Sequence, residues 1–254
     1  MILDQFKLTD KVAVVTGAAT GLGKAMAIGL AEAGADIVGV YNTHTPEDVQ
    51  EQIEATGRKF LGVQANLVSI EPIPKIIEQA VNTFGKVNIL VNNAGIIRRG
   101  NVLEFTEQDW DDVMNINLKT AFFLSQAVAN QFIKQGTGGK IINIASLLSF
   151  QGGIRIPSYT SSKSGMKGLT QLLANEWAQY QINVNAIAPG YMATDNTAPL
   201  RNDLVRNKAI LERIPAGKWG DPADLQGAVV FLASAASNYM NGFTMAVDGG
   251  WLGR

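Results

Sequence analysis

Short apolar runs alternate with longer amphipathic stretches along the whole chain. The apolar runs are rich in Val and Ile and do not alternate strictly with polar residues, which is typical of strands covered by helices on both faces. They are Val12–Thr16, Ile37–Tyr41, Phe60–Ala65, Ile89–Asn92, Lys140–Ala145, Asn183–Ala188 and Phe243–Val247. This pattern predicts about seven strands in a parallel sheet.

The stretches between these strands have the length and the polar–apolar spacing of helices. They are Leu22–Ala33, Pro72–Phe84, Trp110–Lys134, Ser162–Tyr180 and Pro222–Ala236. Helices that connect parallel strands form right-handed crossovers and cover the sheet. The sequence therefore predicts an α/β fold with a doubly wound, Rossmann-type sheet. Because no Pro- or Ser-rich linker divides the chain, we expect one catalytic domain over residues 1–254.

Composition narrows the classes of function. The chain has 254 residues, 46% of them hydrophobic, and its net charge of −1 argues against a protein that binds nucleic acid or anionic membranes. It has no cysteine, which excludes disulfides, thiolate metal sites and cysteine nucleophiles. The only histidine, His44, lies in a polar stretch and argues against a hydrolase triad. The first residues lack the features of a signal peptide, so we expect the cytoplasm.

A glycine-rich turn follows the first predicted strand and leads directly into a helix. Gly17 permits a tight turn, Gly21 lets the backbone approach a pyrophosphate, and Gly23 allows the helix to pack closely on the strand. The free amides at the start of the helix would bind phosphate charge. A plain strand-to-helix turn is the alternative. However, the next strand begins near residue 37, which completes a dinucleotide-binding unit of about 30 residues.

A tyrosine and a lysine four residues apart suggest acid–base chemistry. Tyr159 and Lys163 would lie on one face of a helix, where the ammonium group favours the phenolate. To act as a base near neutral pH, the pKa of the phenol, ordinarily about 10, would have to fall by roughly two to three units. Ser146, at the end of a strand, is placed to bind the same substrate oxygen. In isolation, a solvated Tyr–Lys surface pair is the alternative.

Four motifs occur in an order that resembles the short-chain dehydrogenase/reductase family over essentially the whole chain. They are the T-G-x-x-x-G-x-G turn at 16–23, Asn92-Asn93-Ala94-Gly95, the Tyr159–Lys163 pair and Pro189-Gly190. The resemblance implies that Tyr159 is the general acid/base, that Ser146 orients and polarises the carbonyl or alcohol, and that Lys163 binds the nicotinamide ribose. It also implies that Asn117, rather than Asn115, helps to hold a water in a proton relay. The reaction would be hydride transfer between the nicotinamide C4 and a carbinol carbon, with no metal.

The resemblance also implies where the dinucleotide binds, namely at the carboxyl ends of the strands. The expected cofactor-binding residues are Gly17, Thr20, Gly21, Leu22, Gly23, Tyr41, Asn42, Asn66, Leu67, Asn93, Ala94, Gly95, Tyr159, Lys163, Pro189, Gly190 and Thr194, with Asn92 beside them. The second strand ends in Tyr41-Asn42 without the acidic residue typical of NAD enzymes, and Asn66 stands where the family usually has Asp. Because no basic residue near these positions would bind a 2′-phosphate, the sequence favours NAD, with NADP as the alternative.

Four further stretches resemble members of the family that act on sugar acids from pectin-derived uronates. They are 150–158, 189–194, 214–220 and 247–251. A sugar-acid carboxylate should bind a guanidinium group, so Arg98 and Arg155 join Ser146 and Tyr159 as candidate substrate residues, with Arg99 as a third arginine. For each arginine, a solvated surface position is the alternative.

The remaining expectations concern a lid, the assembly and rival functions. The polar, mixed-charge segment 191–213 predicts a substrate lid. The helix after Lys163 and the helix near 118–133 are apolar over much of their girth, and family members form tetramers through these helices, although core packing explains part of the pattern. The rival functions are a reductase for another sugar acid, a cyclic alcohol or an acyl thioester, and a non-catalytic nucleotide sensor.

Overall fold

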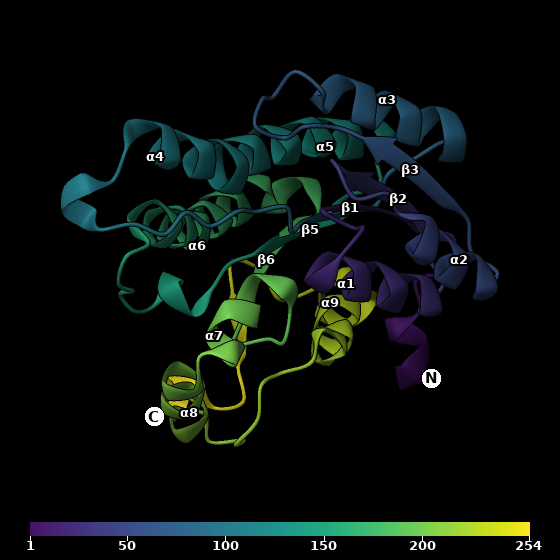
Figure 1. The fold of residues 1–254 in the computed structure, drawn as a ribbon. Helices are drawn as coiled ribbons and strands as arrows, with labels where there is room; N and C mark the ends of the chain where they lie inside the picture. Colours follow the sequence, from purple (N-terminus) through teal and green to yellow (C-terminus); the bar gives the residue numbers. More distant parts are fainter.

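A seven-stranded sheet lies between two layers of helices in the computed structural model, which describes residues 1–254 (Figure 1). All neighbouring strands are parallel, and their order is β3-β2-β1-β4-β5-β6-β7. The strands are β1 (Val12–Thr16), β2 (Asp36–Tyr41), β3 (Phe60–Gln64), β4 (Ile89–Asn92), β5 (Gly139–Ile144), β6 (Ile182–Pro189) and β7 (Thr244–Val247). The predicted doubly wound fold is confirmed. The order reverses between β1 and β4, and a crevice at such a switch point is where ligands bind in open α/β sheets.

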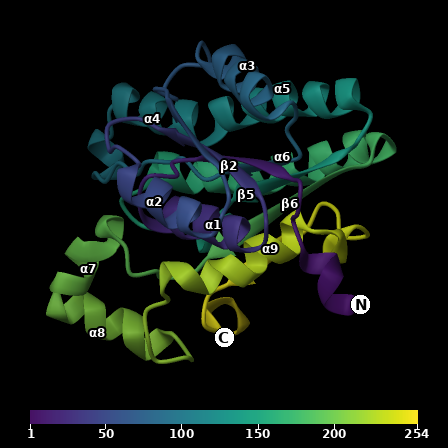
Figure 2. The ribbon, with the colours of Figure 1, turned by 90° about the vertical axis from the view of Figure 1, so that its right-hand side faces the viewer.

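Helices cover both faces of the sheet (Figures 1 and 2). One face carries α1 (Gly21–Glu32), α2 (Glu47–Ala55) and α9 (Gln226–Ala233), and the other carries α3 (Ile73–Phe84), α5 (Ala121–Gln135) and α6 (Pro157–Trp177). The remaining helices are α4 (Glu107–Met114), which precedes α5, and α7 (Ala198–Asn202) and α8 (Leu204–Arg213), which follow β6 and lie apart from the two layers (Figure 2).

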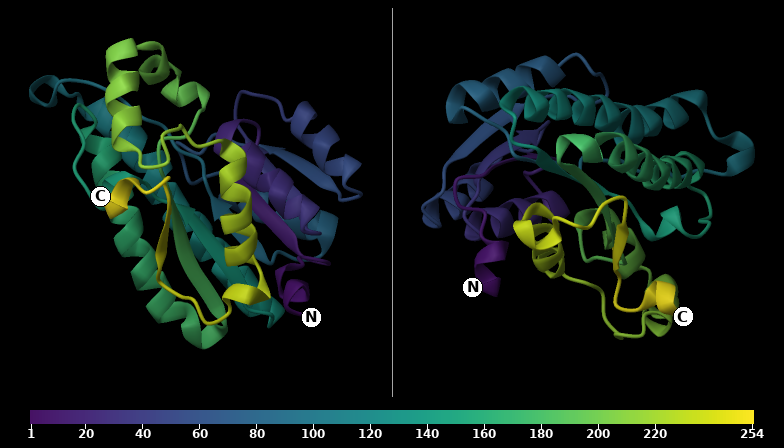
Figure 3. Two further views of the ribbon diagram at one scale, coloured as in Figure 1. Left: turned by 90° about the horizontal axis from the view of Figure 1, so that it is seen from below. Right: turned by 180° about the vertical axis from the view of Figure 1, so that it is seen from behind.

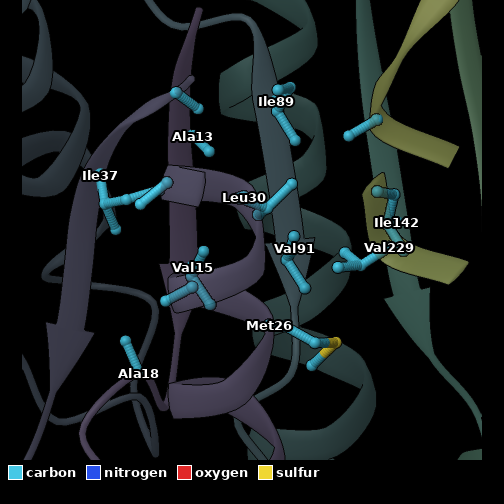
Figure 4. Close-up of a cluster of buried hydrophobic side chains, with 14 of the residues drawn as sticks. Ala13, Val15, Ala18, Met26, Leu30, Ile37, Ile89, Val91, Ile142 and Val229 are labelled. Carbon is cyan, nitrogen blue, oxygen red and sulfur yellow. The ribbon is translucent and has the colours of Figure 1, made fainter. Parts of the chain in front are cut away.

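The core consists of two apolar layers, one on each face of the sheet. On the first face, Val15 and Val91 of the strands pack among Met26 and Leu30 of α1 and Val229 of α9 (Figure 4). On the second face, residues of α3, α5 and α6 cover the alternate positions of the same strands. Because both faces are buried, the strands show continuous apolar runs in the sequence.

The helices differ from the predicted ones at several places, and α7 and α8 have no counterpart among the predicted helices. The pattern missed α2, in which only Val49 and Ile53 are buried, so that its apolar stripe is too short to stand out. The expected single helix 110–134 is interrupted by a π-helical turn over Asn115–Thr120, between α4 and α5. The helix α6 begins at Pro157, five residues before the expected start, because proline is favoured in the first helical turn. No helix has the length and apolar character that crossing a membrane requires.

Candidate active site

The turn between β1 and α1 has the shape that a pyrophosphate requires. Gly17 and Gly21 have φ angles of 65° and 54°, in the left-handed region that favours glycine. A Cβ on Gly23 would lie 2.0 Å from the carbonyl oxygen of Gly17, so this position excludes any side chain. Thr20 is the N-cap of α1 but makes no capping hydrogen bond, which leaves the amides of the first turn, including that of Leu22, free of a side-chain acceptor. The cradle therefore fits a dinucleotide's phosphates.

The motif after β4 braces this turn. The Nδ2 atom of Asn93 donates to the carbonyl oxygens of Thr16 at 2.8 Å and Gly17 at 3.3 Å. The backbone amides of Asn93 and Ala94 donate to the Thr16 hydroxyl at 3.0 and 2.9 Å. Since β1 and β4 are neighbours, these bonds fix the two turns that enclose the switch point.

Asn92 differs from its neighbour and does not line the cleft as expected. It is 5% exposed, and its Nδ2 atom donates to Asn143 Oδ1 at 2.9 Å and to the Ser125 hydroxyl at 2.8 Å. Its side chain points into the protein because successive residues of a strand face opposite sides of the sheet. Asn92 is therefore a structural residue beneath the cleft.

The catalytic candidates converge at the carboxyl end of β5. Ser146 follows this strand, and Tyr159 and Lys163 belong to the first turns of α6. The Ser146 hydroxyl is a hydrogen-bond partner that lowers the pKa of Tyr159. The Nζ atom of Lys163 lies 5.7 Å from the centre of the Tyr159 ring and donates to the carbonyl oxygen of Ile144 at 2.5 Å. The structure thus brings these three residues together.

The electrostatics differ from the expectation that Lys163 lowers the pKa of the phenol. Burial raises the pKa of Tyr159 above its ordinary value, against the opposing effects of the Ser146 hydroxyl and the Arg99 cation. Burial also lowers the pKa of Lys163 to about 8. Because the ammonium group of Lys163 is directed toward the Ile144 carbonyl, the cation that acts on the phenol is Arg99. Burial thus favours the neutral phenol of Tyr159.

Asn117 lies in the π-helical turn and connects two parts of the site. Its Oδ1 atom accepts from the Ile96 amide at 2.9 Å, and its Nδ2 atom donates to the Ile96 carbonyl at 3.0 Å and the Ser162 hydroxyl at 3.3 Å. A Cβ on Gly95 would lie 3.2 Å from Oδ1, so the chain passes close to this amide. The side chain holds the segment after β4 against α6. Its two Nδ2 hydrogens and one lone pair of Oδ1 are used within the protein, and the role in holding a water stays a prediction. Single π-turns are frequent at functional sites.

The other predicted cofactor residues lie along the carboxyl edge of the sheet. Tyr41 ends β2 and Asn42 follows it, Asn66 and Leu67 come after β3, and Pro189 ends β6 with Gly190 next in the chain. At Gly190 a Cβ would lie 2.6 Å from the Asp248 Cα, which explains the glycine. The Thr194 methyl group lies 3.8 Å from where a Cβ on Gly21 would be, so the segment after β6 approaches the glycine turn.

The three arginines have different surroundings. Arg98 forms ion pairs with Asp109 at 3.5 Å and Asp112 at 3.2 Å on α4, so its charge is already compensated. Arg155 is exposed, with φ at 63°. Arg99 acts on the Tyr159 phenol, and its guanidinium group reaches the Asn196 carbonyl oxygen at 3.5 Å. Of the three arginines, Arg99 is the one whose charge lowers the pKa of Tyr159, which its position in the sequence did not reveal.

Comparison with known proteins identifies the family to which the chain belongs. The profile of the short chain dehydrogenase family matches residues 11–205. The chain belongs to this family. The resemblance inferred from the motifs is confirmed, and the protein is an NAD(P)-dependent oxidoreductase that acts on CH–OH groups.

Two relatives and one solved structure are similar to this short-chain dehydrogenase over its full length. It is 65% identical to 2-dehydro-3-deoxy-D-gluconate 5-dehydrogenase of Dickeya dadantii over 254 residues, all of both chains, and 64% identical to the Escherichia coli protein of that name over the same length. The structure of a gluconate 5-dehydrogenase from Burkholderia cenocepacia, in complex with NADP and tartrate, is similar with a TM-score of 0.93 and 37% identity, over 100% of both chains.

Gly23→Ala tests the glycine turn. We expect dinucleotide affinity to fall by roughly tenfold or more, because a Cβ would collide with the Gly17 carbonyl and distort the phosphate cradle. The control is Gly227→Ala in α9, where a Cβ meets no atom within 4 Å. Fluorescence titration with NAD and NADP measures both variants. Equal affinity in Gly23→Ala and the wild type would show that the turn does not bind the dinucleotide.

Lys163 makes the stability of the protein depend on pH. Its folded-state pKa of about 8 is below the ordinary 10.5, so the unfolded chain binds more protons between these values. The free energy of unfolding should therefore rise with pH through this window, by about 3 kcal/mol in total from this group. Denaturant titrations are run from pH 7 to 9.5. This range lies below the pH at which the raised pKa of Tyr159 would make the free energy of unfolding fall as pH rises. Lys163→Met should lose its own share of the rise and keep the share of Lys140, whose pKa burial also lowers to about 8, whereas the exposed Lys134→Met should keep the whole rise. The same slope in both variants would contradict the effect of Lys163.

Proposed function

We propose that this short-chain dehydrogenase interconverts 2-dehydro-3-deoxy-D-gluconate and 3-deoxy-D-glycero-2,5-hexodiulosonate, a step in the breakdown of pectin-derived uronates in the cytoplasm. The observation that carries the proposal is the 65% identity, over the full length of both chains, to a relative named for this substrate. The grouping of Ser146, Tyr159 and Lys163 at the switch point supports it, because these side chains supply what hydride transfer at a CH–OH group needs.

The residues divide the chemistry among them. A bound dinucleotide supplies the hydride acceptor or donor. The Ser146 hydroxyl holds the substrate oxygen, and the Tyr159 hydroxyl gives a proton to that oxygen or takes one from it. Lys163, four residues along the same helix, binds the ribose next to the reaction centre. Asn117 holds the segment after β4 against α6. This contact positions the floor of the cleft relative to Tyr159.

The raised pKa of Tyr159 gives the two directions different requirements. A neutral phenol is ready to protonate the developing alkoxide when a ketone is reduced. In the oxidation direction the phenol must first lose its proton, which the Arg99 cation and the Ser146 hydroxyl assist because both favour the phenolate. A substrate carboxylate bound by Arg99 would weaken that assistance, so the charge of the substrate and the acidity of the phenol are coupled through one side chain.

NAD is the proposed cofactor, with NADP as the alternative. The end of β2 offers neither a carboxylate for the ribose 2′-hydroxyl nor an arginine for a 2′-phosphate. The solved relative from Burkholderia cenocepacia was crystallised with NADP, and a protein from Agrobacterium tumefaciens that is 52% identical, with a TM-score of 0.93 over 99% of this chain and 100% of its own, also has NADP bound. Parallel assays with both dinucleotides decide between them.

The segment 191–213 is proposed as the substrate lid. It contains α7 and α8, and an apolar cluster in which Ile210 is buried with Leu147 and Trp251 anchors it to the body. Within the segment, the Arg201 guanidinium donates to the Thr194 carbonyl at 3.0 Å. Toward the body, the Arg213 guanidinium donates to the Gln151 amide oxygen at 3.2 Å and lies 4.0 Å from the centre of the Trp251 ring. The segment is thus anchored through α8, whereas Leu204 and Val205 at the start of this helix are exposed and leave the junction of α7 and α8 to close over a substrate.

A homotetramer is the proposed assembly. An apolar groove of about 460 Å³ runs along the outer side of the π-turn, α5 and α6, where Leu172 is 50% exposed. Wide apolar helix faces of this kind pack against a partner. Light scattering that shows a monomer would overturn this part of the proposal.

Tyr159→Phe tests the proposed reaction. With 2-dehydro-3-deoxy-D-gluconate and NAD, the wild type should form reduced nicotinamide, and the variant should lose roughly 10²- to 10⁴-fold in kcat because the proton donor is removed. Its affinity for the dinucleotide should stay within about twofold, since the ring remains. D-Gluconate serves as the rival substrate, because the chain is also 39% identical to a gluconate 5-dehydrogenase of Gluconobacter oxydans. No turnover with either sugar acid would discard the substrate class, and would favour the nucleotide sensor if the dinucleotide still binds. Unchanged turnover in Tyr159→Phe would show that another group transfers the proton.

Arg99→Ala tests carboxylate recognition. We expect KM for the sugar acid to rise by roughly tenfold or more, because a charge-assisted hydrogen bond is lost. Arg98→Ala is the matched neighbour and should leave KM unchanged, since its guanidinium group is held by Asp109 and Asp112. Arg155→Ala shows whether the exposed arginine contributes. If all three variants keep the wild-type KM, no arginine of this set binds the carboxylate.

A further inference from the structure

A second cavity, polar and of about 690 Å³, opens at the amino ends of the strands, whereas the active site lies at their carboxyl ends. Its walls come from the amino ends of the strands: Lys11 precedes β1, Asn88 precedes β4, and Lys140 and Asn183 are the second residues of β5 and β6. The segment after α9 closes one side, and the amino-terminal turn Ile2–Phe6 lies beside that segment (Figure 3). None of the residues assigned to the active site lines this cavity.

The cavity carries uncompensated positive charge. Three lysines line it, Lys7, Lys11 and Lys140, and no Asp or Glu does. Lys7 forms an ion pair with Asp4 at 2.5 Å. Lys11 and Lys140 form no ion pair with any carboxylate, although Asp10 is adjacent to Lys11 in the chain.

Neutral groups hold the Lys140 ammonium group in place without cancelling its charge. It donates to Asn183 Oδ1 at 2.8 Å and to Asn238 Oδ1 at 2.9 Å. The Asn183 amide can turn only its oxygen toward the lysine, because its Nδ2 atom donates to the carbonyls of Asn238 and Met240. The third contact, to the Ser237 hydroxyl, is long at 3.4 Å, so one N–H of the ammonium group is poorly satisfied.

Two further observations favour an anion at this place. Burial and the neighbouring Lys11 cation lower the pKa of Lys140 to about 8, so the charged form is held there against desolvation and repulsion. The Asn88 amide lines the cavity with its Oδ1 atom occupied by the Val12 amide, while its Nδ2 atom donates to no protein group. An oxyanion would accept from the Asn88 amide and the ammonium group and would offset both lysine charges.

We propose that this cavity binds a small, multiply charged oxyanion, a phosphate or a polycarboxylate, between Lys11 and Lys140. The site is separate from the dinucleotide cleft, since the two lie at opposite ends of the parallel strands. A ligand here contacts the segments before β1 and β4 and the starts of β5 and β6. It would thus stabilise the folded protein without touching the reacting groups.

Calorimetric titration of the full-length protein tests the proposal. Inorganic phosphate and citrate are titrated separately at constant ionic strength, with saturating NAD present so that the dinucleotide cleft is filled. The wild type should bind at least one of them saturably at one site per chain. Lys140→Met and Lys11→Met should weaken that binding by roughly tenfold or more. Lys134→Met, an exposed lysine on α5, should bind like the wild type.

The outcomes are distinguishable. Binding of phosphate alone identifies a phosphate site, and binding of citrate as well identifies a general oxyanion site; both support the proposal. Lys11 is exposed, so its variant decides the question even if Lys140→Met does not fold. No saturable binding by the wild type, or the same affinity in Lys11→Met as in Lys134→Met, would overturn the proposal and leave Lys140 as a purely structural link between β5 and β6.

Discussion

The active site depends on one close approach of backbone to backbone, at the turn after β1. No side chain fits at Gly23, and the Asn93 amide fills the remaining space by donating to the carbonyls of Thr16 and Gly17. This contact joins the ends of β1 and β4, which are the strands on either side of the switch point. A pyrophosphate cradle at the start of α1 and a cleft floor after β4 are therefore fixed together, and neither can move without the other.

A buried polar network fixes the catalytic helix in the same way. The Asn92 amide donates to Asn143 on β5, and the Asn143 amide donates to the Thr170 hydroxyl on α6 at 2.9 Å. Hydrogen bonds of this kind offset the cost of burying polar groups and are directional. Because α6 also carries Tyr159 and Lys163, the network sets their position relative to Ser146 at the end of β5. The asparagines beneath the cleft thus align the groups above it.

The fold and the grouping of the candidate catalytic residues could be predicted from the sequence because their signals are local. Runs such as Val12–Thr16 are buried on both faces of the sheet and are therefore continuously apolar up to Thr16. The glycines after Thr16 mark a turn in which φ is positive. The features that the sequence did not predict depend on tertiary contacts. The π-turn around Asn117 and the short helix α2 have no periodic pattern of their own. The pKa of Tyr159 and the place of Arg99 follow from burial and charge placement, which spacing along the chain does not encode.

A crystal structure of the Tyr159→Phe variant with NAD and 2-dehydro-3-deoxy-D-gluconate tests the central claim most directly. The account predicts the pyrophosphate on the amides of Gly21–Gly23, the nicotinamide ribose at Lys163, and the reacting carbinol between Ser146 and residue 159. A dinucleotide bound away from the glycine turn, or a sugar acid whose hydroxyl does not reach Ser146, would contradict it.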